Sequence, residues 1–318
     1  MKNTVCSPLY RDPIYDGAAD PTVIFNPNDN KWYMFYTQRR ANVPGAGVAY
    51  CYGCDIGVAV SEDCGMSWYY LGALDLNFEW GKHTFWAPEV VFYDGTFHMY
   101  VTYTKGVQPY KWGGDTSIIH YTSDDILIWR KQSKLNLQSK SAIDACIFQL
   151  PNGGFRMWYR NCDAGNTYTW CCDSDNLYDW SDQRGVISGF DYHEGQNVFR
   201  YGDYYWLIAD TGNGMYVFRS DDLENWQFQK EKILEYPGHR LDDGACGHHG
   251  DIVVSGGNAY IFYFTHPERN ADFRAKINEC MPVNYPYELR RSSVQVAKLE
   301  CIDGKLICDR NIDFKLAL

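Results

Sequence analysis

The sequence predicts an all-β protein, a five-bladed β-propeller with four-stranded antiparallel blades around a central channel. Two observations predict this fold. Runs of alternating aromatic and aliphatic residues occur five times along the 318 residues, and an acidic turn that leads to a tryptophan follows each of the first four runs. When residues 33, 98, 156, 205 and 260 are aligned, the repeats are 49 to 65 residues long, enough for a four-stranded sheet with its loops.

Each of the five aromatic runs is expected to be the second strand of one blade. The runs lie at residues 32–36, 97–101, 155–159, 204–208 and 259–263. Aromatic and β-branched residues favour a pleated, half-buried surface, and Gly, Pro, Asn and Asp interrupt the chain between the runs. No long stretch keeps apolar residues at the spacing of an amphipathic helix.

The turn that follows each of the first four runs completes the signature of a blade. These turns and their tryptophans lie at residues 61–68, 123–129, 174–180 and 220–226. An ordinary sandwich of aromatic strands gives no reason for a two-part signature repeated in this order, so the sequence favours a propeller. No Pro/Ser-rich or charged linker divides the chain, and residues 1–318 are therefore expected to form a single domain.

Composition narrows the classes of partner and of cofactor. A formal net charge of −11 disfavours nucleic acid and anionic membranes, and an aromatic share of 17% suits the stacking of rings on sugars. The sequence shows no signal-peptide core and no membrane-spanning apolar run, so a cytoplasmic protein is expected. The twelve cysteines are expected to be reduced thiols, because Cys51 and Cys54 have no second pair at the interval that zinc requires. No particular oligomeric state is predicted.

A titratable residue stands at a similar distance ahead of each aromatic run. Nine to thirteen residues before the aligned positions lie Asp20, Glu89, Asp144, Glu194 and His249. The first strand of each propeller blade lines the channel, so these side chains are expected to converge near one mouth. Crowded carboxylates raise one another's pKa and cost stability, which indicates a function. For Glu89, a structural role as a turn cap or arginine partner is a stronger alternative than for the others.

Three of these groups could cleave a glycosidic bond. That reaction needs a protonated acid at the leaving oxygen and a carboxylate that activates water or attacks directly. A third carboxylate near the acid can raise its pKa and keep it protonated at neutral pH. Asp20, Asp144 and Glu194 supply one candidate for each role.

The ordered motifs resemble glycoside hydrolase family 43 from about residue 20 to residue 298. They are Ala19-Asp20-Pro21, Trp86-Ala87-Pro88-Glu89, Ile143-Asp144-Ala145, His193-Glu194-Gly195 and Gly247-His248-His249-Gly250. That family is built as a five-bladed propeller and mostly hydrolyses arabinose- and xylose-containing glycans with inversion. Two departures, Glu89 in place of the usual Asp and Gln196 in place of a common Pro, lie in or beside the predicted pocket and leave open an unusual subgroup that acts on another sugar.

The resemblance implies a role for each matched residue. Asp20 matches the general base, Asp144 the carboxylate that tunes the acid and orients the substrate, and Glu194 the general acid. His249 matches a last-blade histidine that in relatives holds a central water or a calcium ion, so no cofactor is required, and a structural calcium, a water or a hydrogen bond to a carboxylate is left open at His249. The expected reaction removes a terminal arabinofuranose or xylose from oligosaccharides with inversion.

Loops between the second and third strands of each blade should open on the same mouth as the catalytic groups. These loops lie at residues 38–54, 105–116, 160–167, 210–215 and 266–291. The expected substrate-binding residues, from these loops and from the inner strands, are Trp86, Glu89, Arg39, Arg40, Tyr110, Trp112, His249, His266 and Arg269. The last loop is the longest and could act as a lid over a single terminal sugar.

Other functions are left open. Retaining fructosidases of the same clan carry an Arg-Asp-Pro motif in a middle blade, whereas Arg11-Asp12-Pro13 precedes the first strand here, so Asp12 is interpreted as a turn or N-terminal strap residue. A galactoside-cleaving enzyme of the same clan is another alternative. A propeller that only binds glycans would keep the aromatic rim but would not need three inward carboxylates.

Overall fold

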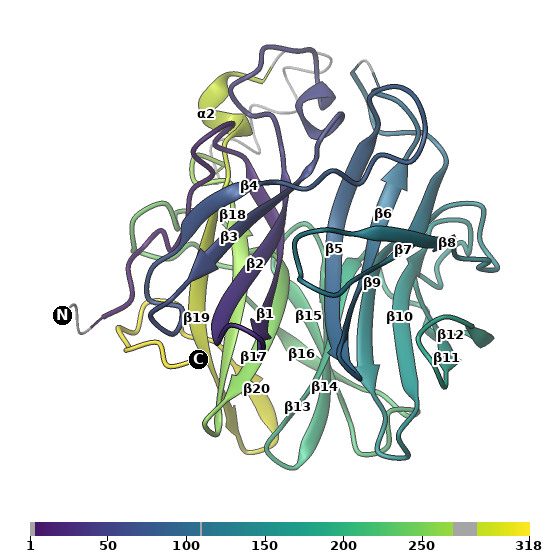
Figure 1. Ribbon diagram of the computed structural model, residues 1–318. Helices are drawn as coiled ribbons and strands as arrows, with labels where there is room; N and C mark the ends of the chain where they lie inside the picture. The colour runs from purple at the N-terminus through teal and green to yellow at the C-terminus, as the bar shows by residue number, and fades with distance from the viewer. Residues whose placement is uncertain (1–3, 109, 270–284) are drawn as a thin grey trace.

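The computed structural model of the chain contains five four-stranded antiparallel sheets, which confirms the predicted propeller (Figure 1). It describes residues 4–108, 110–269 and 285–318. The sheets are formed, in chain order, by β1 Ala18–Asn26, β2 Lys31–Gln38, β3 Ile56–Ser61 and β4 Tyr69–Ala73; by β5 Thr84–Tyr93, β6 Thr96–Thr104, β7 Thr116–Ser123 and β8 Arg130–Lys134; by β9 Ala142–Gln149, β10 Phe155–Asn161, β11 Thr169–Ser174 and β12 Ser181–Ile187; by β13 Glu194–Tyr201, β14 Tyr204–Asp210, β15 Met215–Ser220 and β16 Gln227–Ile233; and by β17 His248–Ser255, β18 Asn258–Thr265, β19 Ser293–Ile302 and β20 Lys305–Ile307.

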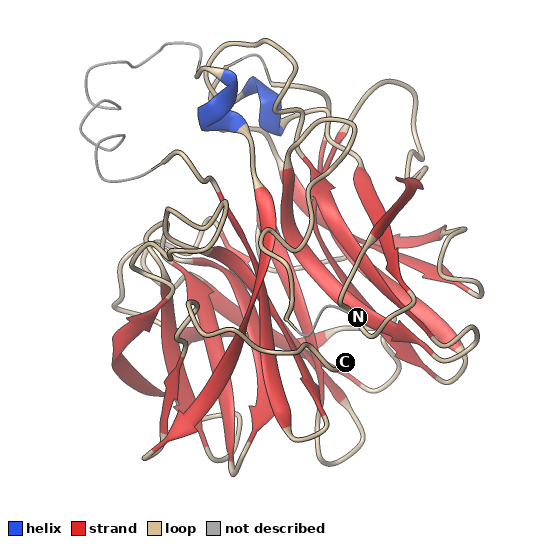
Figure 2. Cartoon of the chain, turned by 90° about the vertical axis from the view of Figure 1, so that its left-hand side faces the viewer, coloured by secondary structure: helices blue, strands red, loops and turns tan. Residues whose placement is uncertain are grey.

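The first strand of each sheet lies innermost, as predicted. Strands β1, β5, β9, β13 and β17 each contact the next one, and β17 contacts β1, so the five strands form a closed ring. Two short helices, η1 Ala49–Cys51 and α2 Tyr287–Arg290, lie together at one end of this ring (Figure 2). That end carries the long loops of the first and last blades and is called the mouth below.

The repeated tryptophans pack between neighbouring blades. Each lies just before or at the start of the fourth strand and meets an aromatic ring on the second strand of the preceding blade, nearly edge to face. The pairs and their ring-centroid distances are Trp68–Phe262 at 6.5 Å, Trp129–Phe35 at 6.0 Å, Trp180–Tyr100 at 5.7 Å and Trp226–Trp158 at 6.3 Å. Aromatic pairs of this geometry add stability beyond their buried area, so the two-part signature joins one blade to the next.

The chain termini close the ring between the first and last blades. The amide of Val5 donates to the carbonyl oxygen of Phe314 over 3.0 Å, and the amide of Leu9 donates to the carbonyl of Val294 over 2.9 Å. Asp12 is buried and accepts hydrogen bonds from Tyr36 and Gln38 on β2, at 3.0 and 2.9 Å. Asp12 is therefore a strap residue, as its position before the first strand indicated.

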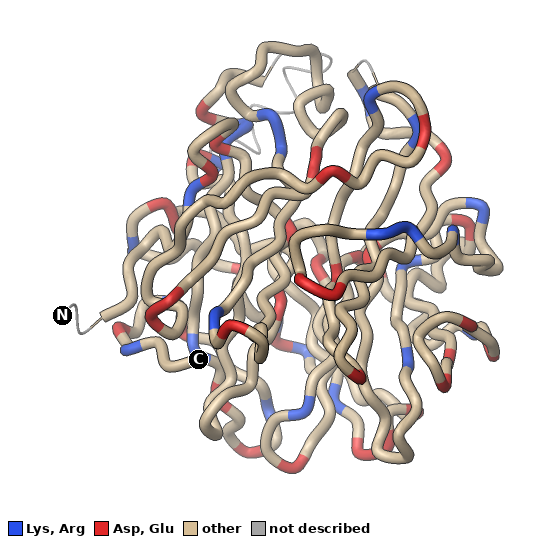
Figure 3. The backbone as a smooth tube through the Cα atoms, viewed as in Figure 1, with Lys and Arg blue, Asp and Glu red and all other residues tan. Residues whose placement is uncertain are grey.

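The cysteines and helices of the described residues bear on the composition. All eleven cysteines among them are free thiols. No helix in the described ranges is long and apolar enough to cross a membrane. Lys and Arg residues lie among Asp and Glu residues along the backbone in Figure 3.

A buried histidine pair in the second blade should make the fold sensitive to acid. His98 Nδ1 and His120 Nε2 are 3.0 Å apart, and burial lowers the pKa of His98 to about 4 and that of His120 to about 3, from 6.5. Because the pKa values are lowered in the folded state, the contribution of the uncharged histidine pair to stability is fully present above pH 6.5 and is lost as the pH falls through 4. We expect the wild type to lose on the order of 2 kcal/mol over this interval.

The substitution His120→Phe should flatten this dependence, because Phe can keep the stacking contact with Tyr100, whose ring centroid lies 4.7 Å from that of His120. Urea unfolding at several pH values measures the effect. His239→Gln, at an exposed histidine, is the control. Equal acid sensitivity of the His120→Phe variant and the control would contradict the assignment.

Candidate active site

Each inner strand is interrupted by a bulge at the same level. Pairing with the second strand slips between Ala19 and Thr22, Trp86 and Glu89, Ile143 and Cys146, Glu194 and Asn197, and His248 and Asp251. One residue in each bulge has a positive φ: Asp20 at 47°, Ala87 at 43°, Asp144 at 58°, Gly195 at 59° and His249 at 38°. Bulges re-aim side chains, and non-glycine residues with positive φ are costly and cluster at functional sites.

This equivalence corrects the sequence prediction in two blades. In the second and fourth blades, Ala87 and Gly195 occupy the position that Asp20, Asp144 and His249 occupy in the other three. Glu194 lies one residue before Gly195, and Glu89 lies two residues after Ala87. The second blade therefore contributes no titratable group at this level. Counting back from the aromatic run missed this because the count changes with the length of the turn and with the extra residue of the bulge.

Asp20 and Glu194 are each held by an arginine. Arg39 Nη2 donates to both carboxylate oxygens of Asp20, at 3.1 and 3.2 Å. Arg160 Nη1 and the Tyr192 hydroxyl both donate to Oε2 of Glu194, each at 2.5 Å. The Asp20 side chain is 7% exposed and that of Glu194 33% exposed. Glu194 is thus the more accessible of the two.

The Asp144 carboxylate interacts electrostatically with both Asp20 and Glu194. Its Oδ2 accepts a hydrogen bond from the amide of Gly195 at 3.0 Å. Burial raises the pKa of Asp144 from 3.8 to about 7; Glu194 and Asp20 also raise it, while His249 and Arg160 oppose the shift. The predicted trio of Asp20, Asp144 and Glu194 is therefore brought together, and burial favours the protonated form of Asp144.

Removing the charge of Asp144 should stabilise the protein at high pH. Because the pKa of Asp144 is raised in the folded state, its contribution to the stability of the wild type is fully present below pH 3.8 and is lost as the pH rises through about 7. We expect Asp144→Asn to be more stable than the wild type at about pH 8, by on the order of 2 kcal/mol, and to have lost most of its activity. Urea unfolding at about pH 5 and pH 8 tests this; a variant that is less stable at both values would contradict it.

His249 lies beside Asp20, with its Nδ1 3.6 Å from Oδ1 of the carboxylate. Its amide donates to Oδ2 of Asp210 at 3.1 Å. A Cβ at position 195 would lie 2.8 Å from Nδ1 of His249, so only glycine fits there, and its φ of +59° needs glycine as well. Burial lowers the pKa of His249, but Asp20, Asp144, Asp210 and Glu194 raise it more, which favours the imidazolium.

This surrounding does not fit the calcium ion that the resemblance allows. Calcium takes six to eight oxygen ligands, whereas His249 presents a ring nitrogen that pairs with Asp20. Among the residues that the structure describes, no group of three or more His, Cys, Asp or Glu could hold a metal ion.

Glu89 faces a different part of the channel. Its Oε1 accepts a hydrogen bond from the amide of Ile147 at 2.7 Å, and burial together with Asp251 raises its pKa well above the usual range. Asp251 accepts from the amide of Val23 and from Asn197, at 2.8 and 3.0 Å. Glu89 is therefore a buried partner of the inner strands, and its role in binding substrate stays a prediction.

Three other predicted substrate residues support loops. Arg40 donates to the carbonyl oxygens of Tyr52 and Ala49, at 2.7 and 3.0 Å, so its guanidinium is bound within its own loop. His266 is 2% exposed, and its Nδ1 lies 2.8 Å from the carbonyl oxygen of Arg291. Arg269 donates to the Tyr50 hydroxyl at 2.6 Å and so joins the last-blade loop to the first-blade loop. Residues 270–284 of the predicted lid lie outside the described residues.

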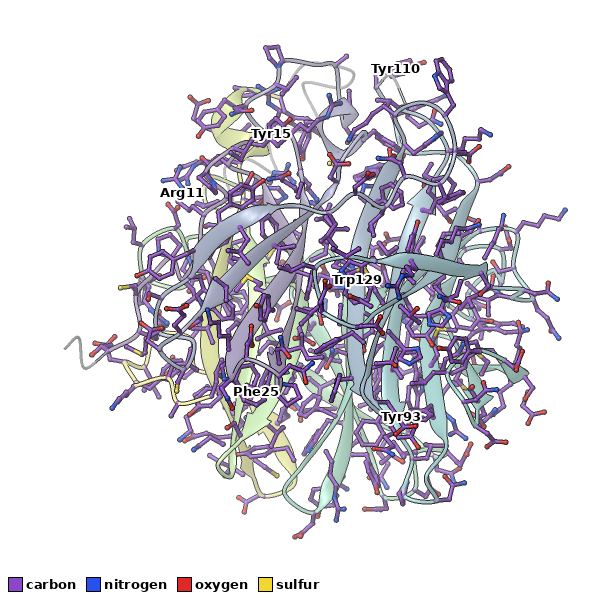
Figure 4. All side chains as sticks on the ribbon, viewed as in Figure 1. Arg11, Tyr15, Phe25, Tyr93, Tyr110 and Trp129 are labelled. Atoms are coloured by element: carbon purple, nitrogen blue, oxygen red, sulfur yellow. The ribbon has the colours of Figure 1, made fainter. Side chains whose placement is uncertain are left out.

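Two of the remaining predicted residues, Trp86 and Trp112, form an aromatic shelf at the mouth together with Tyr52, which was not predicted. Ring centroids lie 5.0 Å apart for Tyr52 and Trp86, and 6.0 Å apart for Trp112 and each of the other two. Trp86 Nε1 donates to the carbonyl oxygen of Cys51 at 2.6 Å, which fixes the shelf to the first-blade loop. Trp112 is 60% exposed and Tyr110 47% exposed, and Figure 4 shows Tyr110 at the top of the molecule.

The sequence analysis missed Arg160, Tyr192, Asp210 and His248 as site residues. The one available signal for Arg160 was its place after an aromatic run. Arg160 directly follows the third run, and Arg39 comes three residues after the first. The others meet their partners only through pairing between strands and between blades, which single-sequence spacing does not reveal.

Comparison with known proteins supports the family resemblance. No model of a known protein family matches the chain. Two curated relatives, each described as a probable arabinan endo-1,5-α-L-arabinosidase A, are 26% identical: that of Neosartorya fischeri over 74% of this chain and 72% of the relative, and that of Aspergillus fumigatus over 76% and 74%.

Solved structures share the fold over nearly the whole chain. A thermostable family-43 glycoside hydrolase matches with a TM-score of 0.68 at 19% identity, over 94% of this chain and 96% of that one. A β-xylosidase/α-arabinofuranosidase from a compost metagenome, solved with xylotriose, matches with 0.69 at 16% identity, over 96% of both chains. A Xanthomonas citri enzyme of the same family, solved with xylose, matches with 0.68 at 15% identity, over 96% and 92%. These likenesses show that the chain has the fold of those glycoside hydrolases.

Proposed function

We propose that this propeller is a glycoside hydrolase that cleaves arabinose- or xylose-containing oligosaccharides, with Asp20 as general base and Glu194 as general acid. The convergence of Asp20, Asp144 and Glu194 from three blades carries the proposal. The relatives support the class of substrate, because their descriptions name arabinan, xylose and xylotriose.

Glu194 is suited to protonate the leaving oxygen. It is more exposed than Asp20, and both Arg160 and Tyr192 bind its Oε2, which orients the carboxyl group. Burial raises the pKa of Asp144, and the charge of Glu194 raises it further, so Asp144 lies close enough to interact with the proposed acid. A carboxyl group in this position can donate a proton to the glycosidic oxygen as it departs.

Asp20 is suited to activate the water that attacks the anomeric carbon. Arg39 contacts both of its oxygens and fixes the orientation of the carboxylate. The Nε atoms of Arg39 and Arg160 are buried and have no partner among the described residues. A buried donor without a partner is costly, which suits a functional rather than a structural role of the two arginines. In an inverting reaction, the base and the acid act from opposite faces of the sugar.

Release of a terminal sugar is the proposed mode of action. Arg269 joins the last-blade loop to Tyr50 of the first-blade loop, and Arg290 donates to the carbonyl oxygen of Val43 at 2.5 Å. These contacts link the loops of the first and last blades at the mouth. The link supports a site that accepts one end of a sugar chain.

The aromatic shelf should bind the part of the substrate beyond the cleaved bond. Trp112→Ala is expected to raise KM for oligosaccharides about fivefold with little change in kcat, because one stacking contact contributes roughly 1 kcal/mol. KM for small aryl glycosides should not change. Tyr93→Ala, at an exposed aromatic residue that Figure 4 shows at the opposite end, is the control. Equal effects of the two substitutions would contradict a role for the shelf.

A panel of aryl glycosides tests the proposed function. It should include arabinofuranoside, xyloside, galactoside and fructoside, followed by arabino- and xylo-oligosaccharides whose products are sized. Monosaccharide as the first product would support terminal release, and internal fragments would show endo cleavage. Proton NMR of the first product gives its anomeric configuration, so retention would contradict the inverting mechanism. Tight oligosaccharide binding without turnover would indicate a glycan-binding propeller instead.

A further inference from the structure

We infer that Cys246 is a reactive thiol and a modification site for hydroperoxides and other soft electrophiles, activated by His248 and Asp210. Sγ of Cys246 lies 3.5 Å from Nε2 of His248, and Nδ1 of His248 lies 3.1 Å from Oδ2 of Asp210. A nucleophile, an imidazole within reach of it and a carboxylate that orients the imidazole are the arrangement by which proteins activate thiols.

The fold fixes all three groups at the mouth. Asp210 ends β14, and His248 begins β17 two residues after Cys246. The Asp210 carboxylate also accepts hydrogen bonds from the amides of Gly212 and His249, at 2.7 and 3.1 Å, so it cannot turn away from His248. Cys246 is 9% exposed, and its sulfur also lies 3.8 Å from the carbonyl oxygen of Gly212.

The charges around His248 favour a thiolate at Cys246. Burial lowers the pKa of His248, but Asp210 and the sulfur of Cys246 raise it to about 10. The rings of Phe264 and His266 cover the imidazole, and burial together with Arg269 and Arg39 lowers the pKa of His266 well below the usual range, so His266 adds no charge. An imidazolium next to a cysteine sulfur stabilises the thiolate, which is the nucleophilic form.

Cys246 and His248 supply the nucleophile and the proton that the reaction with a hydroperoxide needs. The thiolate sulfur attacks one peroxide oxygen, a sulfur–oxygen bond forms and the oxygen–oxygen bond breaks. The leaving oxygen takes the proton from Nε2 of His248. The sulfur is oxidised to a sulfenic acid, the peroxide is reduced to water or an alcohol, and a thiol can restore the cysteine.

Modification of Cys246 should disturb the positions of the proposed catalytic residues. Asp210 binds both His248 and the amide of His249, and His249 faces Asp20. An adduct on the sulfur needs room in a nearly buried place and would displace this chain of contacts. The reactivity of the thiol does not depend on the proposed function, whereas the loss of glycosidase activity rests on it.

Alkylation with iodoacetamide, followed residue by residue by mass spectrometry, tests the reactivity. Cys64 and Cys162 are exposed and serve as internal references. At about pH 6.5, where ordinary thiols are mostly protonated, we expect Cys246 to react roughly tenfold faster than Cys64. His248→Gln should remove this advantage at that pH and have a smaller effect near pH 9.5.

Alkylation of Cys246 no faster than that of Cys64 in the folded wild type would overturn the proposal, and this comparison needs no variant. A fast rate that His248→Gln leaves unchanged in a folded variant would overturn the role of His248. With hydrogen peroxide, dimedone should trap a sulfenic acid at Cys246, and oxidation confined to Cys64 would contradict it. If the enzyme is active, peroxide should inactivate the wild type and spare Cys246→Ser.

Discussion

Replacing Asp20 by asparagine is expected to lower kcat about a thousandfold on any substrate that the protein hydrolyses, with little change in KM. General base catalysis contributes between about a hundredfold and ten-thousandfold, and asparagine cannot take the proton from the attacking water. Asn tolerates the positive φ of 47° at this position, and its side-chain oxygen can still accept from Arg39. The loss should therefore be chemical rather than structural.

Asp94→Asn is the matched control for this prediction. Asp94 also has a φ of 47°, but it is exposed in the turn between β5 and β6. Steady-state kinetics and thermal unfolding of both variants separate catalysis from folding. If Asp20→Asn kept more than a tenth of the wild-type kcat while folded, Asp20 would not be the general base.

The largest expected loss of stability is at a buried ion pair in the last blade. Arg310 and Asp243 form a salt bridge whose side chains are 4% and 0% exposed, and Tyr263 donates to the same carboxylate. Arg310 also donates to the carbonyl oxygens of Tyr236 and Ala245, each at 2.9 Å. Removing one partner of a buried pair leaves the other charge uncompensated, so Arg310→Met should cost about 3 to 5 kcal/mol.

Guanidinium unfolding of Arg310→Met measures this cost. The control is Arg130→Met, which breaks an exposed pair with Asp124 whose side chains are 68% and 70% exposed, and it should cost less than about 1 kcal/mol. Replacing Asp243 by asparagine in the Arg310→Met background should recover part of the loss, because the unpaired charge is then absent. Equal effects of Arg310→Met and Arg130→Met would contradict the burial argument.

The sequence predicted the fold because its repeated signature has a direct structural cause. Trp68, Trp129, Trp180 and Trp226 each fill the contact with the preceding blade, so four blades need an aromatic run and a tryptophan at fixed spacing. The fifth blade lacks that tryptophan, and ring closure relies on the terminal segments instead. Such closure depends on contacts between chain ends, which spacing along the sequence does not express.

The candidate site was predicted only where its residues lie at or beside the bulges. Asp20, Asp144 and His249 occupy equivalent bulge positions, and Glu194 is displaced by one residue. Glu89 was misplaced because its bulge puts Ala87 at that level. Arg40 and His266 carried the right chemistry for sugar binding, but backbone carbonyls of loops bind them.

The contacts of Gln196 give a physical reason why glutamine occupies this position instead of proline. Its Nε2 donates to the Thr169 hydroxyl at 3.0 Å, and that hydroxyl lies 2.8 Å from Nε2 of His193. A proline could not make this contact. The link ties β13 to the neighbouring β11 just behind Glu194, so it supports the segment that carries the proposed acid.

The most direct test of the central claim compares leaving groups in wild type and Glu194→Gln. Both proteins should be assayed on a dinitrophenyl glycoside, whose leaving group departs without a proton, and on the matching disaccharide, whose sugar leaving group needs one. Glu194 as general acid predicts that the variant loses at least about a hundredfold in kcat/KM on the disaccharide and nearly nothing on the dinitrophenyl glycoside. Equal losses on the two substrates would contradict the account.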